Sequence, residues 1–280
     1  MEVKERIITG KKSTAEYLKE IWLYRELFWI LAKRDILVKY KQTVLGVGWS
    51  AIRPLVTTLV MAFAFGKIGK LNVDTSIPFT LAVVPGVIIW LFFSQSLQAL
   101  SQSIVLNSNL VTKVYFPRVI IPLSTIFLGL LDVSIAVLLF IFFCVYYQFM
   151  PDWKIILAPL FIFLSFMSAF GIGLISAVLN VKYRDIGQII PFVIQFGYFV
   201  SPVGYLTDNV RSISDNPWYY KIFVLNPVTG AIDALRWCML GDFAKFNWDS
   251  FIPFIIFIFI TFFWSISFFR KHENSFVDHI

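Results

Sequence analysis

The chain has 280 residues, of which 58% are hydrophobic, 15% are charged and 31 are phenylalanine. Together with a mean hydropathy of +0.77, this composition excludes a soluble globular protein and indicates a polytopic membrane protein. The net charge of +7 then concerns orientation in the membrane, and we expect no nucleic-acid partner. Cys144, Cys238, His272 and His279 are too few and too scattered for a disulfide framework, a metal site or a buried histidine catalyst.

Residues 1–43 are predicted to form a cytoplasmic segment with an amphipathic interfacial helix. No short apolar core follows a basic start, so we expect no cleavable signal peptide. Ser13 and Glu16 have the spacing of a capping box. Apolar side chains then recur at steps of three and four, at Tyr17, Ile21, Tyr24, Phe28 and Leu31. Trp22, Trp29 and many basic residues suit a membrane interface; a soluble helix packed on a partner is the alternative.

Residues 44–270 are predicted to contain six transmembrane helices, because a helix needs about 20 apolar residues to cross roughly 30 Å of hydrocarbon. The six apolar runs are 44–65, 77–97, 119–147, 155–181, 186–202 and 251–269. The third run is the longest and the fifth the shortest, so we expect tilt or a break there. The predicted fold is thus an all-α polytopic membrane protein, with a cytoplasmic tail at 271–280.

Basic residues predict the orientation. With a cytoplasmic amino terminus, sixteen lysines and arginines fall on the cytoplasmic side and seven on the opposite side. An excess of this kind marks the cytoplasmic side of membrane proteins. We therefore expect a multi-pass protein of the inner or plasma membrane with both termini in the cytoplasm.

Two ionisable residues lie inside predicted spans. Asp132 falls near the middle of the third run, where a charge is costly and usually functional; a hydrogen-bonded packing residue is the alternative. Arg53 lies in the first run, near enough to the cytoplasmic end to reach the interface. The alternative for Arg53 is contact with a phosphate that enters laterally from the inner leaflet.

The fifth run carries polar and aromatic residues along one helical face. Gln188, Gln195, Tyr198 and Tyr205, with two prolines between them, follow at steps of three and four. Lipid chains supply no hydrogen-bond partner for an amide or a phenol, so this face is predicted to line a channel. Stacking on tyrosine rings and hydrogen bonds to amides are suited to a sliding sugar polymer; plain helix packing is the alternative.

The cytoplasmic connection at about 105–118 is predicted to be a docking surface, because it ends in an amphipathic stretch with Tyr115, Phe116 and Arg118. An interfacial helix without a partner is equally compatible with its spacing. The external connection is long, and helices at about 208–241 are predicted to re-enter the outer leaflet and cap an opening.

The external helices have clear local signals. Asn226 and Pro227 form a cap with proline at the first helical position, and Gly241 marks the end. Asp233 and Arg236 lie one turn apart and are able to pair. Five external aspartates, Asp233 among them, are interpreted as solvated loop residues, and an interfacial helix pair without a gating role is the alternative.

The chain lacks the motifs of an ATPase or a hydrolase. It contains no GxxxxGK[ST], HExxH, CxxC or GxSxG pattern, and no grouped carboxylates for a membrane transferase. Any ATP-driven step is therefore expected to use ATP and magnesium bound by another chain, and this chain is not expected to be an enzyme.

Several sequence blocks resemble one family in the same order. They are YKQTVLGVGWSAIRPL (40–55), YFPRVIIPLS (115–124), NVKYRDIGQIIPFVIQFGYFVSPVGY (180–205) and NPVTGAIDALRWCMLG (226–241). The chain resembles the permease subunits of ABC-2 type polysaccharide exporters over about residues 21–269. The resemblance implies export of a lipid-linked O antigen, capsule or teichoic acid by two permeases and two nucleotide-binding subunits.

The resemblance also implies roles for individual residues. It assigns 109–118 to a helix that couples to the ATPase, 218–224 and 227–240 to an external gate, and Tyr198 and Tyr205 to the conduit. The predicted coupling residues are Asn109, Leu110, Lys113, Tyr115, Phe116 and Arg118, and the predicted gate residues are Trp218, Tyr219, Asn226, Pro227, Asp233 and Arg236.

Two other functions are weighed against this one. An ABC-2 exporter of drugs or small lipids has the same predicted topology. An ion-coupled secondary transporter is the alternative from a different class, and it rests on Asp132.

Overall fold

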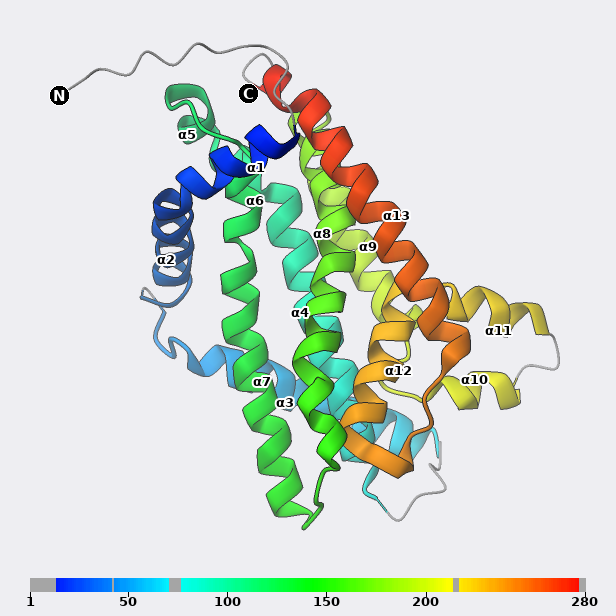
Figure 1. The fold of residues 1–280 in the computed structure, drawn as a ribbon. Helices are drawn as coiled ribbons and strands as arrows, with labels where there is room; N and C mark the ends of the chain where they lie inside the picture. The colour runs from blue at the N-terminus through cyan, green and yellow to red at the C-terminus, as the bar shows by residue number, and fades with distance from the viewer. Residues whose placement is uncertain (1–13, 42, 71–76, 214–216, 277–280) are drawn as a thin grey trace.

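The computed structural model describes residues 14–41, 43–70, 77–213 and 217–276, and these residues form helices and connections without a strand. Four long helices run side by side through the molecule (Figure 1): α4 (Phe79–Leu106), α7 (Ile126–Tyr146), α8 (Ala158–Lys182) and α13 (Trp248–His272). The prediction of an all-α polytopic membrane protein is confirmed.

Five helical segments in the described part of the chain are long and apolar enough to cross a membrane: Gly48–Ile68, Phe79–Leu106, Ile120–Tyr146, Trp153–Lys182 and Trp248–His272. The fifth predicted span corresponds to α9 (Ile186–Val200), which is apolar but has only 15 residues. A helix of that length rises about 22 Å, short of the roughly 30 Å of hydrocarbon. α9 therefore ends before it could cross the hydrocarbon, and the turn that follows it lies inside the helix bundle.

Several spans are interrupted or extended. The first span consists of α3 (Gly48–Met61) and a π-helix, η1 (Ala62–Ile68). The third is divided into α6 (Ile120–Ser124) and α7, and the Thr125 hydroxyl donates to the Pro122 carbonyl at the break, 2.8 Å away. The 3₁₀ helix η2 (Trp153–Leu157) opens the fourth. A break in the long third run was predicted from its length.

The amino-terminal segment forms two helices, α1 (Thr14–Leu23) and α2 (Arg25–Lys41), in place of the single predicted one. The predicted capping residue Ser13 lies outside the described residues. Tyr17 and Leu31 are buried against the bundle, whereas Trp22 and Trp29 are 71% and 57% exposed. The stripe thus packs inward and the tryptophans face outward, which agrees with an interfacial helix pair.

Close packing around α8 holds the bundle together. A Cβ atom added to Gly173 would lie 2.5 Å from the Leu100 Cβ of α4, and one added to Gly171 would lie 2.6 Å from the Thr261 hydroxyl of α13. In lipid, no hydrophobic driving force brings two apolar helices together. Small residues that allow close van der Waals packing are therefore a main source of stability. Glycine at these two positions lets α8 contact both neighbours.

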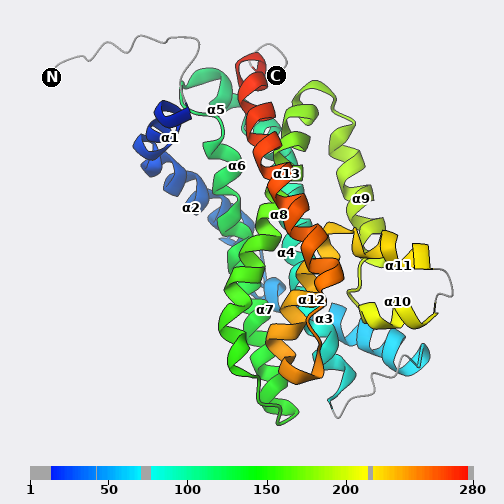
Figure 2. The ribbon, with the colours of Figure 1, turned by 45° about the vertical axis from the view of Figure 1, so that its right-hand side comes forward.

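Three further helices follow the short α9: α10 (Thr207–Ile213), α11 (Pro217–Val224) and α12 (Pro227–Leu240). α10 and α11 lie at one edge of the molecule, and α12 lies between the long helices (Figures 1 and 2). The predicted cap is confirmed, because the Asn226 side chain accepts from the Val228 N–H at 3.0 Å with Pro227 at the first turn. Gly241, with φ +62°, ends α12 and leads into the 3₁₀ turn η3 (Gly241–Phe243).

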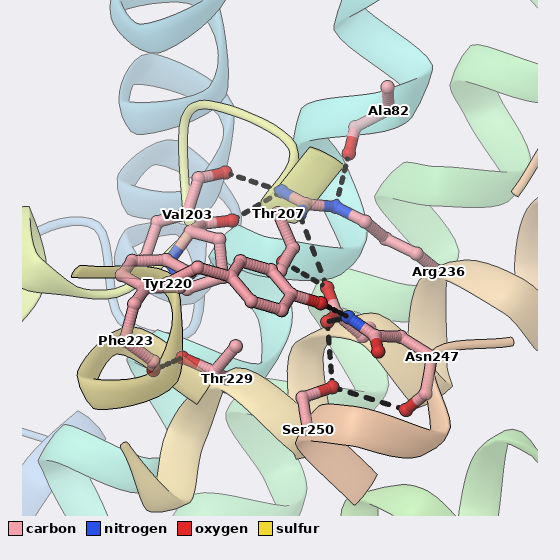
Figure 3. Close-up of polar contacts among 11 residues, drawn as sticks. Ala82, Val203, Thr207, Tyr220, Phe223, Thr229, Arg236, Asn247 and Ser250 are labelled. Atoms are coloured by element: carbon pink, nitrogen blue, oxygen red, sulfur yellow. Dashed lines mark hydrogen bonds and ion pairs between the residues drawn. The ribbon is translucent and has the colours of Figure 1, made fainter. Parts of the chain in front are cut away.

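α12 carries two buried charged side chains, Arg236 and Asp233, and Figure 3 shows the polar contacts of Arg236 with its neighbours. Arg236 Nε donates to the Ala82 carbonyl at 3.0 Å, and Nη2 donates to the carbonyls of Pro202 at 2.5 Å and Val203 at 3.1 Å. These bonds join α12 to α4 and to the turn after α9. A cation at this depth requires such partners.

Asp233 is the second centre of this network. Its carboxylate accepts from Thr207 Oγ1 at 2.7 Å, Ser250 Oγ at 2.8 Å and Asn247 Nδ2 at 3.1 Å, and it lies 4.0 Å from Arg236 Nη1. The interpretation of Asp233 as a solvated loop residue is wrong, because its side chain is 8% exposed. The predicted pairing with Arg236 is confirmed, and the carboxylate also ties α10 and α13 to α12.

We predict that Arg236→Met lowers the free energy of unfolding by about 3–5 kcal/mol, because it leaves Asp233 and three carbonyls without their cationic partner. Thermal unfolding of the purified protein in detergent measures the loss. Arg211→Met is the matched control: Arg211 is exposed and stacks on the Tyr220 ring at 5.5 Å, so we expect a change of about 1 kcal/mol or less. Equal losses in the two variants would contradict the buried network.

Candidate functional site

α9 presents a wide exposed face. Figure 2 shows α9 at the edge of the molecule, on the far side of α8 from α7, and it packs mainly on α4 and α8. Only Ile190 of this helix is buried. Gln188 and Gln195 are exposed, and they share one stripe with three exposed phenylalanines, Phe192, Phe196 and Phe199. The two amides thus lie on an unpacked surface of the single chain.

The two tyrosines predicted to share that face are placed differently. Tyr198 lies on α9 and packs edge-on against Trp90 of α4, with ring centroids 5.8 Å apart, and its buried hydroxyl has no hydrogen-bond partner. Tyr205 lies beyond the end of α9, where its hydroxyl donates to the Phe199 carbonyl at 3.0 Å. The prediction of one helical face through Tyr205 is wrong, because the helix ends at Val200 and the chain turns there.

The predicted coupling segment contains a short helix, α5 (Ser108–Lys113), at the upper end of the molecule in Figure 1. Val111 and Phe116 are buried and Leu110 packs on the core, so they fix the segment from inside. Asn109, Lys113 and Tyr115 are exposed, and Tyr115 is 52% exposed. The segment thus has an anchored inner side and an outer side that is open to a partner.

Neighbouring helices hold the ends of this segment. Arg34 Nη2 of α2 donates to the Asn107 side chain at 2.7 Å, and the Tyr24 hydroxyl donates to the Tyr115 carbonyl at 3.3 Å. The guanidinium of Arg118 lies 6.0 Å from the centroid of the Phe276 ring. The coupling segment therefore contacts both the amino-terminal helices and the end of the chain.

α1 is fastened to the same end of α13. The Tyr17 hydroxyl donates to Glu273 in η4 (Glu273–Ser275) at 2.9 Å, and the Arg270 guanidinium lies 4.8 Å from the Tyr17 ring centroid. Burial raises the pKa of both Tyr17 and Glu273. The phenol therefore stays protonated at neutral pH and remains a donor. The sequence pattern identified Tyr17 only as part of an apolar stripe, because its partners lie more than 250 residues away.

Asp132 joins three elements in the other half of the molecule. Its carboxylate accepts from Lys39 Nζ of α2 at 2.5 Å and also from the hydroxyls of Tyr40 and Ser50. Tyr40 is at the end of α2 and Ser50 in the first turn of α3. Of the two alternatives for Asp132, the hydrogen-bonded packing role agrees with these contacts. Lys39 was recognised as basic, but its pairing across 93 positions had no local signal.

Arg53 lies in the first span beside the same cluster. It is exposed, and it makes no hydrogen bond or ion pair within the described residues. Arg53, Lys39 and Asp132 line a cavity of about 90 Å³ where α2, α3, α4 and α7 meet. The other polar side chains around this cavity are Tyr40, Thr43, Ser50 and Gln95.

The predicted gate residues separate into two groups. Trp218 and Tyr219 on α11 are 65% and 66% exposed at the edge of the molecule. Asn226 binds the turn after α9, because its Nδ2 donates to Ser201 Oγ at 2.9 Å. With Asp233 and Arg236 it belongs to the buried anchor of α12, and only the α11 aromatics are available at the surface.

Comparison with known proteins places this geometry in a family. The family model described as "ABC-2 type transporter" matches residues 26–240. An O-antigen export system permease protein RfbA of Myxococcus xanthus is 26% identical over 219 residues, which cover 78% of this chain and 82% of that protein. A protein of the same description from Klebsiella pneumoniae is 25% identical over 234 residues, covering 82% and 86%. Because the family model covers well over half of the sequence, the chain belongs to the ABC-2 type transporter family.

Proposed function

We propose that this chain is the membrane permease of an ATP-driven exporter of a lipid-linked polysaccharide, of the O-antigen, capsule or teichoic acid kind. The single observation that carries the substrate is the similarity along about four fifths of the chain to permeases named for O-antigen export. The exposed stripe of glutamines and phenylalanines on α9 supports it, because amides bond hydroxyls and rings stack on sugars.

The chain works as a transport subunit in this proposal, and a separate subunit binds ATP and magnesium. The missing phosphate-binding motif supports this division. The exposed outer side of α5 is the proposed docking surface for the ATPase. We place this end of the molecule in the cytoplasm, together with both termini, in the inner or plasma membrane.

In this proposal, two copies of the chain surround the path of the polysaccharide across the membrane, and one ATPase subunit binds to each copy. The support is the poor burial of two apolar segments: α9 has one buried residue, and only 11% of the most apolar window of the first span is buried. Motion of the ATPase at α5 passes through its inner side to the bundle and separates the two copies. The exposed aromatics of α11 cap the opposite end.

Two other functions receive less support. An exporter of drugs or small lipids needs no polar stripe on α9. An ion-coupled transporter needs a carboxylate that exchanges a proton or a cation, but Asp132 is already engaged by Lys39, Tyr40 and Ser50.

Tyr115→Ala is expected to weaken copurification of the chain with its ATPase about fivefold or more, because exposed aromatics are frequent hot spots of interfaces. The affinity is measured by pull-down from membranes that contain both subunits. Trp218→Ala, an exposed aromatic at the other end, is the matched control and is expected to copurify normally. Normal copurification of Tyr115→Ala would remove α5 as the main docking surface.

The double variant Gln188→Leu and Gln195→Leu is expected to slow export several-fold while the complex assembles normally, because leucine does not bond sugar hydroxyls. Polymer at the cell surface is measured against complex yield. Ser134→Leu, at an exposed position on α7, is the matched control. Unchanged export in the double variant would indicate that the stripe only contacts lipid and has no role in export.

Asp132→Asn is expected to keep ATP-dependent export within a few-fold of wild type, because asparagine still accepts hydrogen bonds and no proton is transported through this site. Export is measured with and without a protonophore in the presence of ATP. An ATPase subunit with its phosphate-binding lysine replaced supplies the inactive control. Loss of export in Asp132→Asn, with dependence on the proton gradient in wild type, would support ion coupling instead.

A further inference from the structure

The residues that follow α13 contact two distant parts of the chain at once. They form the 3₁₀ turn η4 (Glu273–Ser275), and Phe276 comes directly after it. The Phe276 ring is 1% exposed and packs on Phe269 of α13, with ring centroids 5.4 Å apart. A ring buried this completely holds the turn against the bundle. We call residues 273–276 the carboxy-terminal clasp.

Phe276 also contacts the end of the coupling segment, residues 105–118. The Arg118 guanidinium lies 6.0 Å from the centroid of the Phe276 ring, and it makes no hydrogen bond or ion pair with the described residues. An aromatic face attracts a guanidinium at this distance, and more strongly where water is partly excluded. Phe116 and Val119, on either side of Arg118, are buried. The ring therefore holds a segment whose inner side is already anchored.

Glu273 in the same turn holds α1. Its carboxylate accepts from the Tyr17 hydroxyl at 2.9 Å, and Tyr17 is 7% exposed. Burial raises the pKa of the Glu273 carboxyl, whereas the Tyr17 hydrogen bond and the positive charges of Arg118 and Arg270 lower it. Both guanidinium groups thus lie close enough to act on this carboxylate. The clasp joins α1, the end of the coupling segment and α13.

α13 links these contacts to the buried anchor of α12. α5 packs on α4, and the clasp adds a second connection, from Arg118 through Phe276 to α13. α13 runs from the clasp toward α12 (Figure 1), where Ser250 in its first turn donates to Asp233 at 2.8 Å. A movement of the coupling segment therefore has a continuous helical path to the Asp233 network.

We propose that the carboxy-terminal clasp positions the coupling segment, with Phe276 as the positioning residue for Arg118 and Glu273 as the positioning residue for α1. Without the clasp, the outer side of α5 still meets the ATPase, but its movement is not passed to α13. The attachment of the coupling segment and of α1 rests on the contacts above. The transfer of ATP-driven movement rests on the proposed function.

The first test measures backbone hydrogen exchange in the purified chain in detergent, without the ATPase. Phe276→Ala is expected to raise exchange in residues 108–118 about threefold or more, because Arg118 loses the ring that holds it. Phe268→Ala is the matched control, since the Phe268 ring contacts Trp264 and His272 of its own helix. Exchange in residues 108–118 of this control is expected to match wild type.

A second variant tests the attachment of α1. Tyr17→Phe removes only the hydroxyl that donates to Glu273. It is expected to raise exchange in α1 about twofold or more, because one hydrogen bond is lost, and to leave residues 108–118 at the wild-type rate. Unchanged exchange in α1 would overturn the role of Glu273.

The second test measures polysaccharide exported per ATP hydrolysed in the complex with the ATPase. Phe276→Ala is expected to lower this ratio about threefold or more, with normal copurification of the ATPase. A variant that is only less stable lowers the amount of complex and leaves the ratio unchanged. Phe276→Leu keeps a buried apolar side chain without the ring, so it is expected to lower the ratio too and replaces Phe276→Ala if that variant does not fold.

The two tests fail in different ways. Wild-type exchange in residues 108–118 of Phe276→Ala, or an equal rise in Phe268→Ala, would overturn the clasp. Raised exchange with an unchanged export ratio would overturn its role in transferring movement. A wild-type complex that exports no polysaccharide would refute the proposed function, while the exchange measurements, made without ATPase or polymer, still decide whether the clasp holds the coupling segment.

Discussion

The guanidinium of Arg236 can remain inside the bundle because Nε and Nη2 donate to three backbone carbonyls and Nη1 lies 4.0 Å from the Asp233 carboxylate. Carbonyls come from α4 and from the turn after α9, and the Asp233 carboxylate lies one turn away on α12. Water and lipid offer no substitute at this depth. This need for acceptors fixes the position of α12, the early end of α9 and the attachment of α10. Arg236 bonds to the turn after α9, and Asp233 bonds to Thr207 of α10.

This anchor gives the end of the molecule that carries α11 a rigid base. Gly86 shows how tightly it is built: a Cβ atom there would lie 2.6 Å from the Val203 carbonyl and 3.0 Å from Arg236 Nη2. The gating motion that we propose therefore belongs to the exposed α11 and to the contact between two copies, and α12 moves with the bundle. A short α9 followed by a fixed turn leaves its outer stripe free to face a transported polymer.

The other end combines an anchored and an open surface. The segment around α5 is held from inside by buried apolar side chains, at Asn107 by Arg34 of α2, and at Arg118 by Phe276, which follows α13 and η4. α1 binds that same end of α13 through Tyr17. A partner that pushes on α5 would thus act on several helices at once, as the proposed coupling role requires.

The sequence by itself determined the membrane class, five of the six spans, the cap and end of α12, and the apolar stripe of α1 and α2. These depend on apolar length, helical periodicity and turn residues, all of which are local. Only the tertiary structure decided that Asp233 is buried, that Tyr205 leaves the helical face, and that Asp132 is bound by Lys39. A side chain's burial and its partner depend on residues tens to hundreds of positions away, and no local pattern encodes that distance.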